Sequence, residues 1–319
     1  MTQPPPECVA PGVYAIDTGY VRPGLAAAHL LVRGGQAAFV DPGPAPALPR
    51  LLAALDALGV DCAAVAFIFV THVHLDHAGG AGALLQHLPN ARVVAHPRAM
   101  RHLADPARLV EGTVAVYGPA RTAELYGTVV PVPADRLIEA ADGFEVGLGA
   151  SALRALDTPG HARHHYCLHD PDGQAVFTGD TFGISYRELV VAGRPFLFPT
   201  TTPVQFDPVA LHASVDRIAA LAPARVFLMH YSVLDRPVER AADLHAGIEA
   251  LVGLARSQPP ADPALFEAAL ADRILEHWLA ELAARDCTLP AAHQVELLTV
   301  DAQLNAQGLR VWLQGGPAR

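Results

Sequence analysis

Residues 71–80 read THVHLDHAGG and directly follow the apolar run VAFIFV at 65–70. The apolar run has the length and composition of a buried strand. If the chain leaves that strand extended, His72 and His74 project to the same side and can share one metal ion. A helix beginning near Ala78 would turn the adjacent Asp76 and His77 toward a second point nearby. Imidazole nitrogens with carboxylate oxygens suit Zn, Fe or Mn, so the stretch predicts a metal site.

Three further polar residues occur in the same context, each just beyond an apolar strand. His161 follows LRALDTPG, Asp180 follows AVFTG and His230 follows ARVFLM. Strand ends of this kind converge on one edge of a sheet sandwich, where sites are usually built. We therefore expect these residues to join the histidine-rich stretch.

The composition excludes several classes of function. The chain has 319 residues, 51% of them hydrophobic, with 22 basic against 32 acidic residues. This length supports a large core, and the absence of a basic run disfavours nucleic-acid binding. The four cysteines are scattered, without CxxC spacing, which favours a reducing, cytoplasmic location. We recognise neither a secretory leader nor a membrane span in the sequence, and we expect a small-molecule substrate.

Short strands alternate with helices up to about residue 180, which predicts an α/β or α+β sandwich with sheets inside and helices outside. The expected strands are 12–19, 27–35, 36–43, 65–70, 91–97, 144–148, 152–160, 165–170, 174–180 and 224–230. Residues 47–60 and 207–221 have helical spacing, and a helix is expected at about 80–87. Residues 1–235 are predicted to form the metal-binding domain.

Residues 236–319 are predicted to be a mainly helical C-terminal region. Phe266, Leu270, Ile274 and Trp278 recur at four-residue intervals and give one helix an apolar stripe. Packing of this stripe within its own domain is the favoured interpretation, and a homodimer interface is the alternative. The segment RSQPPADP at 256–263 predicts a break between helices.

Taken in order, THVHLDH, TPGH, FTGD and MHY resemble the motifs of the metallo-β-lactamase-fold hydrolases, with VDPG upstream. The resemblance covers roughly residues 12–232. It implies an αββα sandwich with a dinuclear centre and a helical C-terminal extension. Carried over position by position, one metal is held by His72, His74 and His161. The other is held by Asp76, His77 and His230, with Asp180 as the bridge.

Departures from known branches narrow the resemblance. Zinc β-lactamases usually have cysteine at the position of Asp180, and flavodiiron proteins usually have glutamate at that of His74. The RNA-processing branch has a large inserted domain and a basic surface, and this sequence shows no sign of either. The ligand set looks like that of glyoxalase II and its relatives, although we cannot identify the glutathione-binding basic cluster of that enzyme. GDTFGISYRE followed by FPTTTP resembles a less characterised subgroup.

The resemblance implies a hydrolase in which two divalent ions, expected to be zinc with iron or manganese as alternatives, activate a bridging water. Asp76 and Asp180 are the candidate catalytic residues that orient this water and move its proton. A small ester, thioester or lactone is the expected substrate. The alternative is an iron-dependent oxidoreductase of the persulfide dioxygenase type, and the intact ligand set disfavours a non-catalytic scaffold.

Weaker candidates surround these ligands. The hypothesised substrate contacts are His165, Tyr186, Arg187 and Tyr231, with His164 and Tyr166 as further options, and structural roles are an equal alternative for them. Asp41 is predicted to fix the loop beneath a ligand histidine. The spacing of five other histidines indicates no site; these are His29, His96, His102, His212 and His245. Residues 101–133 and 182–203 show no pattern that predicts their structure.

Overall fold

The computed structural model describes residues 4–201, 204–259 and 262–315. Pro260 and Ala261 of the predicted break, and Thr202 and Pro203 of the FPTTTP segment, lie outside the described residues. The chain divides into two compact units. Unit 1 contains residues 1–157, 164–179 and 224–233, and unit 2 contains residues 158–163, 180–223 and 234–319. Each unit is described by itself.

A seven-stranded sheet forms the first layer of unit 1, in the order β1-β2-β3-β4-β5-β6-β7. Its strands are β1 (Glu7–Ala10), β2 (Val13–Asp17), β3 (Ala27–Arg33), β4 (Gln36–Val40), β5 (Val65–Val70), β6 (Arg92–Ala95) and β7 (Leu137–Glu139). Strands β1 to β4 pair antiparallel, and β4 to β7 pair parallel. The predicted meander and the predicted strand at 65–70 are confirmed, whereas β1 and β7 were not expected.

A second, six-stranded sheet has the order β15-β14-β11-β10-β9-β8. Its strands are β8 (Glu145–Leu148), β9 (Ser151–Asp157), β10 (Tyr166–Asp170), β11 (Ala175–Gly179), β14 (Arg225–Leu228) and β15 (Ser232–Asp235). Strands β8 to β11 pair antiparallel, and β11 pairs parallel with β14. The predicted strands in this part of the chain are therefore confirmed.

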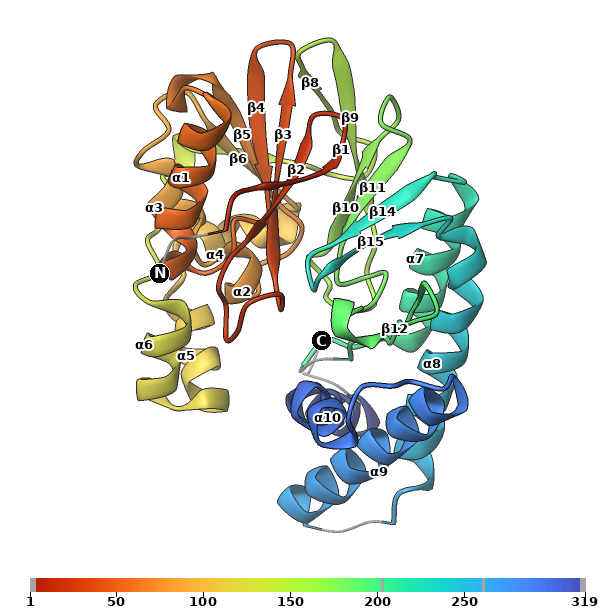
Figure 1. Cartoon of the computed structure of the whole chain (residues 1–319). Coiled ribbons are helices and arrows are strands. Elements are labelled where there is room, and N and C mark those ends of the chain that lie inside the picture. Colours follow the sequence, from red (N-terminus) through yellow and green to blue (C-terminus); the bar gives the residue numbers. More distant parts are fainter. Residues whose placement is uncertain (1–3, 202–203, 260–261, 316–319) are drawn as a thin grey trace. The chain divides into compact units, whose positions relative to one another are not determined.

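The core of unit 1 lies between the two sheets and on the outer face of the first. Phe69, Tyr166, Phe177 and Phe227, from strands of both sheets, belong to one buried cluster. A second cluster packs helices α1 (Leu48–Leu58) and α3 (Ala81–Leu85) against β4 to β6, as Figure 1 shows. Helix α1 ends as predicted at Gly59, whose φ of 64° is a left-handed conformation that glycine adopts readily.

Residues 101–133, for which the sequence shows no pattern, are mostly helical, and helical turns continue to residues 97 and 136 on either side. They form α4 (Met100–Ala104), α5 (Ala107–Tyr117) and α6 (Pro119–Tyr126), with 3-10 turns η3 (Pro97–Ala99) and η4 (Ala134–Arg136). Other 3-10 turns are η1 (Ala45–Ala47), η2 (Cys62–Ala64) and, in unit 2, η5 (Arg187–Leu189). Helix α5 has no fully buried residue, and it contains Gly112 and several β-branched residues. These residues weaken the local helical signal that a sequence pattern reports.

Unit 2 is mainly helical. It contains α7 (Pro208–Ala220), α8 (Val238–Ser257), α9 (Pro263–Ala284), α10 (Ala291–Leu313) and the small hairpin of β12 (Val190–Val191) with β13 (Arg194–Pro195). The break between α8 and α9 lies where the sequence predicts it, because Asp262 caps α9 and Pro263 begins it. These helices confirm the predicted fold class of packed sheets and helices with C-terminal helices.

The apolar stripe of α9 is buried inside unit 2. Phe266, Leu270, Ile274 and Trp278 are each at most 9% exposed, and the Trp278 ring lies 4.6 Å from that of Phe198. The stripe is therefore buried within unit 2, in line with the favoured interpretation, although Phe198 lies outside the predicted C-terminal region 236–319. A homodimer through the C-terminal helices stays a prediction. Among the described residues, we find no helix with the length and hydropathy to cross a membrane.

His29 is a buried histidine in the core of unit 1. His29 of β3 lies with its ring 5.4 Å from that of Phe177 and 5.5 Å from that of Phe227. Burial lowers the pKa of His29 from 6.5 to about 3, because the charged imidazolium loses its hydration. The unfolded chain therefore takes up this proton near pH 6.5, whereas the folded chain does so only near pH 3.

We expect the free energy of unfolding to fall as the pH is lowered from 6.5 to about 3. This one residue should contribute about 1.4 kcal/mol per pH unit in that window. In His29→Leu this contribution should vanish, and urea unfolding across the window measures it. The exposed histidine variant His87→Leu is the control. A parallel loss of stability in wild type and His29→Leu would contradict the assignment.

Candidate metal centre

The histidine-rich stretch leaves β5 and turns into a short helix, α2 (Leu75–Ala78). His74 has an extended conformation, and its carbonyl accepts hydrogen bonds from the N–H groups of His77 and Ala78. The prediction that the helix begins near Ala78 is therefore wrong by three residues. Asp76 and His77 lie within α2 rather than in a turn before it.

His72 and His74 lie together, as the spacing predicts. Nε2 of His72 is 2.9 Å from Nδ1 of His74, and the His72 side chain is fully buried. His74 is partly exposed at the start of α2. The two rings thus bring two imidazole nitrogens to one point in unit 1.

Asp76, His77 and His230 form a second group in unit 1. One possible ligand atom of each lies within 4.8 Å of the others. Nε2 of His230 is 3.1 Å from Oδ2 of Asp76, and Nε2 of His77 is 3.7 Å from the same oxygen. His230 follows the end of β14 and comes to α2 from 154 residues away in sequence. The ends of β5 and β14, one strand from each sheet, therefore bring these three donors together, as the positions of the strand ends predict.

Asp41 contacts His77 of this group and the neighbouring Thr71. Its carboxylate accepts hydrogen bonds from the backbone N–H of Thr71 at 2.8 Å and from the Thr71 hydroxyl at 2.7 Å, and lies 2.9 Å from Nδ1 of His77. Asp41 has a φ of 48°, a strained backbone conformation for a residue with a side chain. Carboxylates commonly anchor the outer nitrogen of a metal-binding histidine in this way. These bonds confirm that Asp41 fixes Thr71 and the His77 ring, while metal binding by His77 stays a prediction.

Unit 2 brings together the remaining two candidates. Nε2 of His161 is 3.3 Å from Oδ2 of Asp180, and both side chains are buried. Gly160, just before His161, has a φ of 129°, and a Cβ there would meet Leu211 at 2.4 Å. Only glycine fits that close approach, so the turn that presents His161 depends on it.

The donor chemistry of these residues fits a metal ion. Neutral imidazole nitrogens and carboxylate oxygens are the usual ligands of Zn, Fe and Mn. His77 also has its other ring nitrogen beside a carboxylate, which orients Nε2 toward Asp76. The residues present therefore suit the divalent ions that the sequence predicts, while the ligand assignment stays a prediction.

The structure places the hypothesised substrate contacts in differing environments. The His165 ring is buried beside His72, with centroids 5.0 Å apart, and the parallel His164 ring lies 6.3 Å from His72. Tyr231 packs on Ala15 and Ala27 of unit 1. Contact of His165 or Tyr231 with substrate stays a prediction.

In unit 2, the Tyr186 side chain is buried and its hydroxyl donates to Asp301 at 2.9 Å, whereas Arg187 is exposed. These contacts give Tyr186 a packing role, and its contact with substrate and that of Arg187 stay predictions. Tyr166 is fully buried in unit 1, and its hydroxyl donates to the carbonyl of Val94 at 3.0 Å. The Tyr166 hydroxyl therefore satisfies a buried backbone carbonyl in the core.

Two tyrosines near α2 had no signal in the sequence. The hydroxyls of Tyr20 and Tyr126 are 2.6 Å apart, and Tyr126 packs on Leu75, the residue before Asp76. Burial raises the pKa of both tyrosines, and the charge of Asp76 raises it further. Both therefore stay protonated beside the candidate ligand. No spacing rule connects two residues so far apart in sequence.

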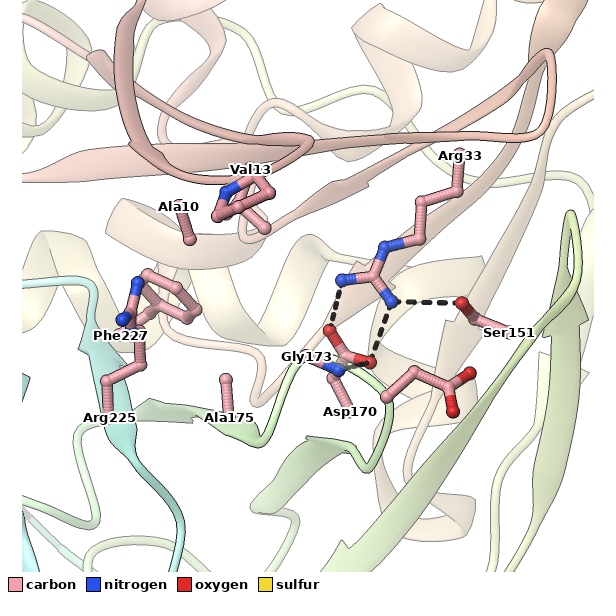
Figure 2. A pocket seen from close by; sticks show the side chains of 11 residues that line it. Ala10, Val13, Arg33, Ser151, Asp170, Gly173, Ala175, Arg225 and Phe227 are labelled. Atoms are coloured by element: carbon pink, nitrogen blue, oxygen red, sulfur yellow. Dashed lines mark hydrogen bonds and ion pairs between the residues drawn. The ribbon is translucent and has the colours of Figure 1, made fainter.

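A separate cavity of about 350 Å³ lies in unit 1, and neither Asp76, His77 nor His230 lines it. Arg33 donates two hydrogen bonds to the carboxylate of Asp170, at 2.8 and 2.5 Å, and one to the hydroxyl of Ser151. Figure 2 shows these three contacts. Ala175 and Arg225 line the cavity at the starts of the parallel strands β11 and β14. His230 follows the opposite end of β14, so the cavity and the group of Asp76, His77 and His230 lie at different ends of this strand.

Comparison with known proteins relates the chain to the metallo-β-lactamase superfamily. The model of the Metallo-beta-lactamase superfamily matches residues 21–230. A hydroxyacylglutathione hydrolase of Alkalilimnicola ehrlichii is 37% identical over 61% of this chain and 56% of its own length. The acyl-coenzyme A thioesterase MBLAC2 of Gallus gallus is 31% identical over 53% of this chain and 62% of its own length.

Among solved structures, the archaeal metallo-β-lactamase superfamily protein ST1585 of Sulfolobus tokodaii has a TM-score of 0.66 and 23% identity. That likeness covers 94% of this chain and 98% of the archaeal protein and supports the fold. The chain spans 51% of the first hydroxyacylglutathione hydrolase that it matches and 66% of another. With the family model covering most of the chain and the sheets as described, the chain belongs to the metallo-β-lactamase superfamily.

Proposed function

We propose that this protein is a metal-dependent hydrolase of small esters, thioesters or lactones, with thioesters as the preferred class. The observation that carries the proposal is the group of Asp76, His77 and His230, anchored by Asp41. Relatives named hydroxyacylglutathione hydrolase and acyl-coenzyme A thioesterase support the choice of thioesters.

We infer that seven side chains hold two divalent ions, expected to be zinc. In this assignment, which follows the family resemblance, His72, His74 and His161 would hold one ion, Asp76, His77 and His230 would hold the other, and Asp180 would be shared by both. The ions, when bound, supply Lewis acidity that lowers the pKa of water toward neutrality and polarises the acyl group.

The chain itself supplies orientation and proton transfer. The two nitrogens of His77 have different tasks, because Nδ1 faces Asp41 and Nε2 faces Asp76. A carboxylate oxygen of Asp76 or Asp180 would accept the proton of the attacking water and deliver it to the leaving thiol or alcohol. The Asp76 side chain is 18% exposed, so solvent reaches part of it.

Metal analysis and a substrate panel test the proposal. Protein purified without added metal should contain two zinc ions per chain by elemental analysis. It should hydrolyse chromogenic thioesters faster than matched esters and lactones, and chelation should remove that activity. A single iron per chain with oxygen uptake on glutathione persulfide would overturn the hydrolase in favour of the dioxygenase alternative.

A further inference from the structure

Two histidines of unit 2, both without a spacing signal in the sequence, face each other between helices α7 and α8. Nδ1 of His212 lies 2.6 Å from Nδ1 of His245. The rings are nearly parallel, with an interplanar angle of 18° and centroids 4.9 Å apart. Their side chains are 25% and 29% exposed, so solvent reaches the pair.

A carboxylate holds the outer nitrogen of each ring. Nε2 of His212 is 3.0 Å from Oε1 of Glu249 on α8, and Nε2 of His245 is 2.9 Å from Oδ1 of Asp216 on α7. Each helix thus carries a histidine with an acidic residue four positions later, in HASVD at 212–216 and HAGIE at 245–249. Each histidine bonds to the acidic residue of the other helix, which makes the arrangement reciprocal.

The positions of the protons on the two rings show that a cation is needed between the Nδ1 atoms. An ionised carboxylate only accepts hydrogen bonds, so Nε2 of both His212 and His245 must carry a proton. In a neutral imidazole the other nitrogen, Nδ1, then presents a lone pair. Two lone pairs would face each other at 2.6 Å, and they repel unless a cation lies between them. Either an extra proton or a metal ion satisfies this requirement.

We propose that His212 and His245 bind a divalent transition-metal ion of the zinc class through their Nδ1 atoms, with water completing the coordination. A carboxylate on the outer nitrogen is the usual support of a metal-binding histidine, and this site has one on each ring. Zn–N bonds of about 2.0–2.1 Å in a tetrahedral site place two nitrogens about 3.3 Å apart. The rings must therefore separate by about 0.7 Å from the observed 2.6 Å.

The surroundings allow that small movement. The Asp216 and Glu249 side chains are 71% and 69% exposed, so both carboxylates can follow the rings. The bound ion would link α7 to α8 through side chains that belong to neither candidate ligand group of the hydrolase. The site is therefore independent of the proposed function.

Zinc content and thermal stability test the site without an activity assay. Wild type and His212→Gln/His245→Gln are saturated with Zn²⁺, and unbound zinc is then removed. Wild type should retain one equivalent more than the double variant. Further addition of Zn²⁺ to metal-depleted protein should raise the unfolding temperature of wild type more than that of the variant. His87→Gln/His293→Gln, which alters two exposed histidines, should match wild type.

A milder change tests the carboxylate support. Asp216→Asn leaves both ring nitrogens in place and should weaken the zinc affinity of the additional equivalent by about tenfold. Circular dichroism checks that each variant is folded. Equal zinc retention by wild type and the double variant would overturn the proposal, and so would an unchanged affinity in Asp216→Asn. The pair would then hold a proton alone.

Discussion

Replacing His74 with alanine should lower hydrolytic activity by more than about 100-fold, because even residues that only support metal ligands cost 10–100-fold when replaced. The His74 side chain is partly exposed, and its Nδ1 lies 2.9 Å from Nε2 of His72. Its removal takes one imidazole from the proposed site and leaves the core of unit 1 unchanged. Thioester hydrolysis and metal content, measured on the same preparation, test this prediction.

The fold of the variant needs its own measurement. Thermal unfolding of metal-depleted wild type and metal-depleted His74→Ala should give similar midpoints, since His74 contributes little buried apolar surface. His87→Ala, an exposed histidine beyond α3, should retain both metal and activity. Retention of activity by His74→Ala would remove this residue from the proposed ligand set.

Replacing Arg33 with alanine should lower the free energy of unfolding by about 3–5 kcal/mol. The Asp170 side chain is fully buried, and Arg33, at 14% exposure, donates two hydrogen bonds to it. The remaining donor, the backbone N–H of Gly173 at 3.0 Å, does not neutralise the carboxylate. The variant therefore leaves an uncompensated charge in the interior, which urea unfolding measures as a lower midpoint.

An exposed ion pair in the same unit provides the matched control. Arg154 lies 4.0 Å from Glu145, and both side chains are about half exposed. Solvent screening limits such pairs to about 1 kcal/mol or less, so Arg154→Ala should have a small effect. If Arg33→Ala were no more costly than Arg154→Ala, the buried pair could not have the structural role that we assign to it.

Much of unit 1 could be predicted because its elements have strong local signals. The apolar run of β5 and the glycine that ends α1 fix those elements without long-range information. The strand-end rule also predicted that His230 would come close to Asp76, although 154 residues separate them. The metal ligation itself stays a prediction, since the sequence shows donor types and the structure shows their grouping.

The remaining features depend on contacts that a local pattern does not encode. Helix α2 begins at Leu75 because the His74 carbonyl accepts two hydrogen bonds, although His74 is not one of the usual capping residues. The Tyr20 and Tyr126 hydroxyls meet only after α6 has packed. The pair of His212 and His245 is likewise invisible in either helix alone, because each histidine has its carboxylate partner on the other helix.

The interleaving of the two units affects how the chain can be made and divided. Strand β11 belongs to unit 1, but its parallel neighbour β14 emerges from the ribosome only after residues 180–223, which belong to unit 2. The six-stranded sheet cannot be completed until β14 has been synthesised. The pairing of β11 with β14 is therefore non-local, and such pairing is slow. Both units consist of several chain segments, so no single cleavage of the chain separates one unit from the other. An N-terminal fragment ending before β14 would leave the edge of β11 unpaired, and an unpaired strand edge favours aggregation.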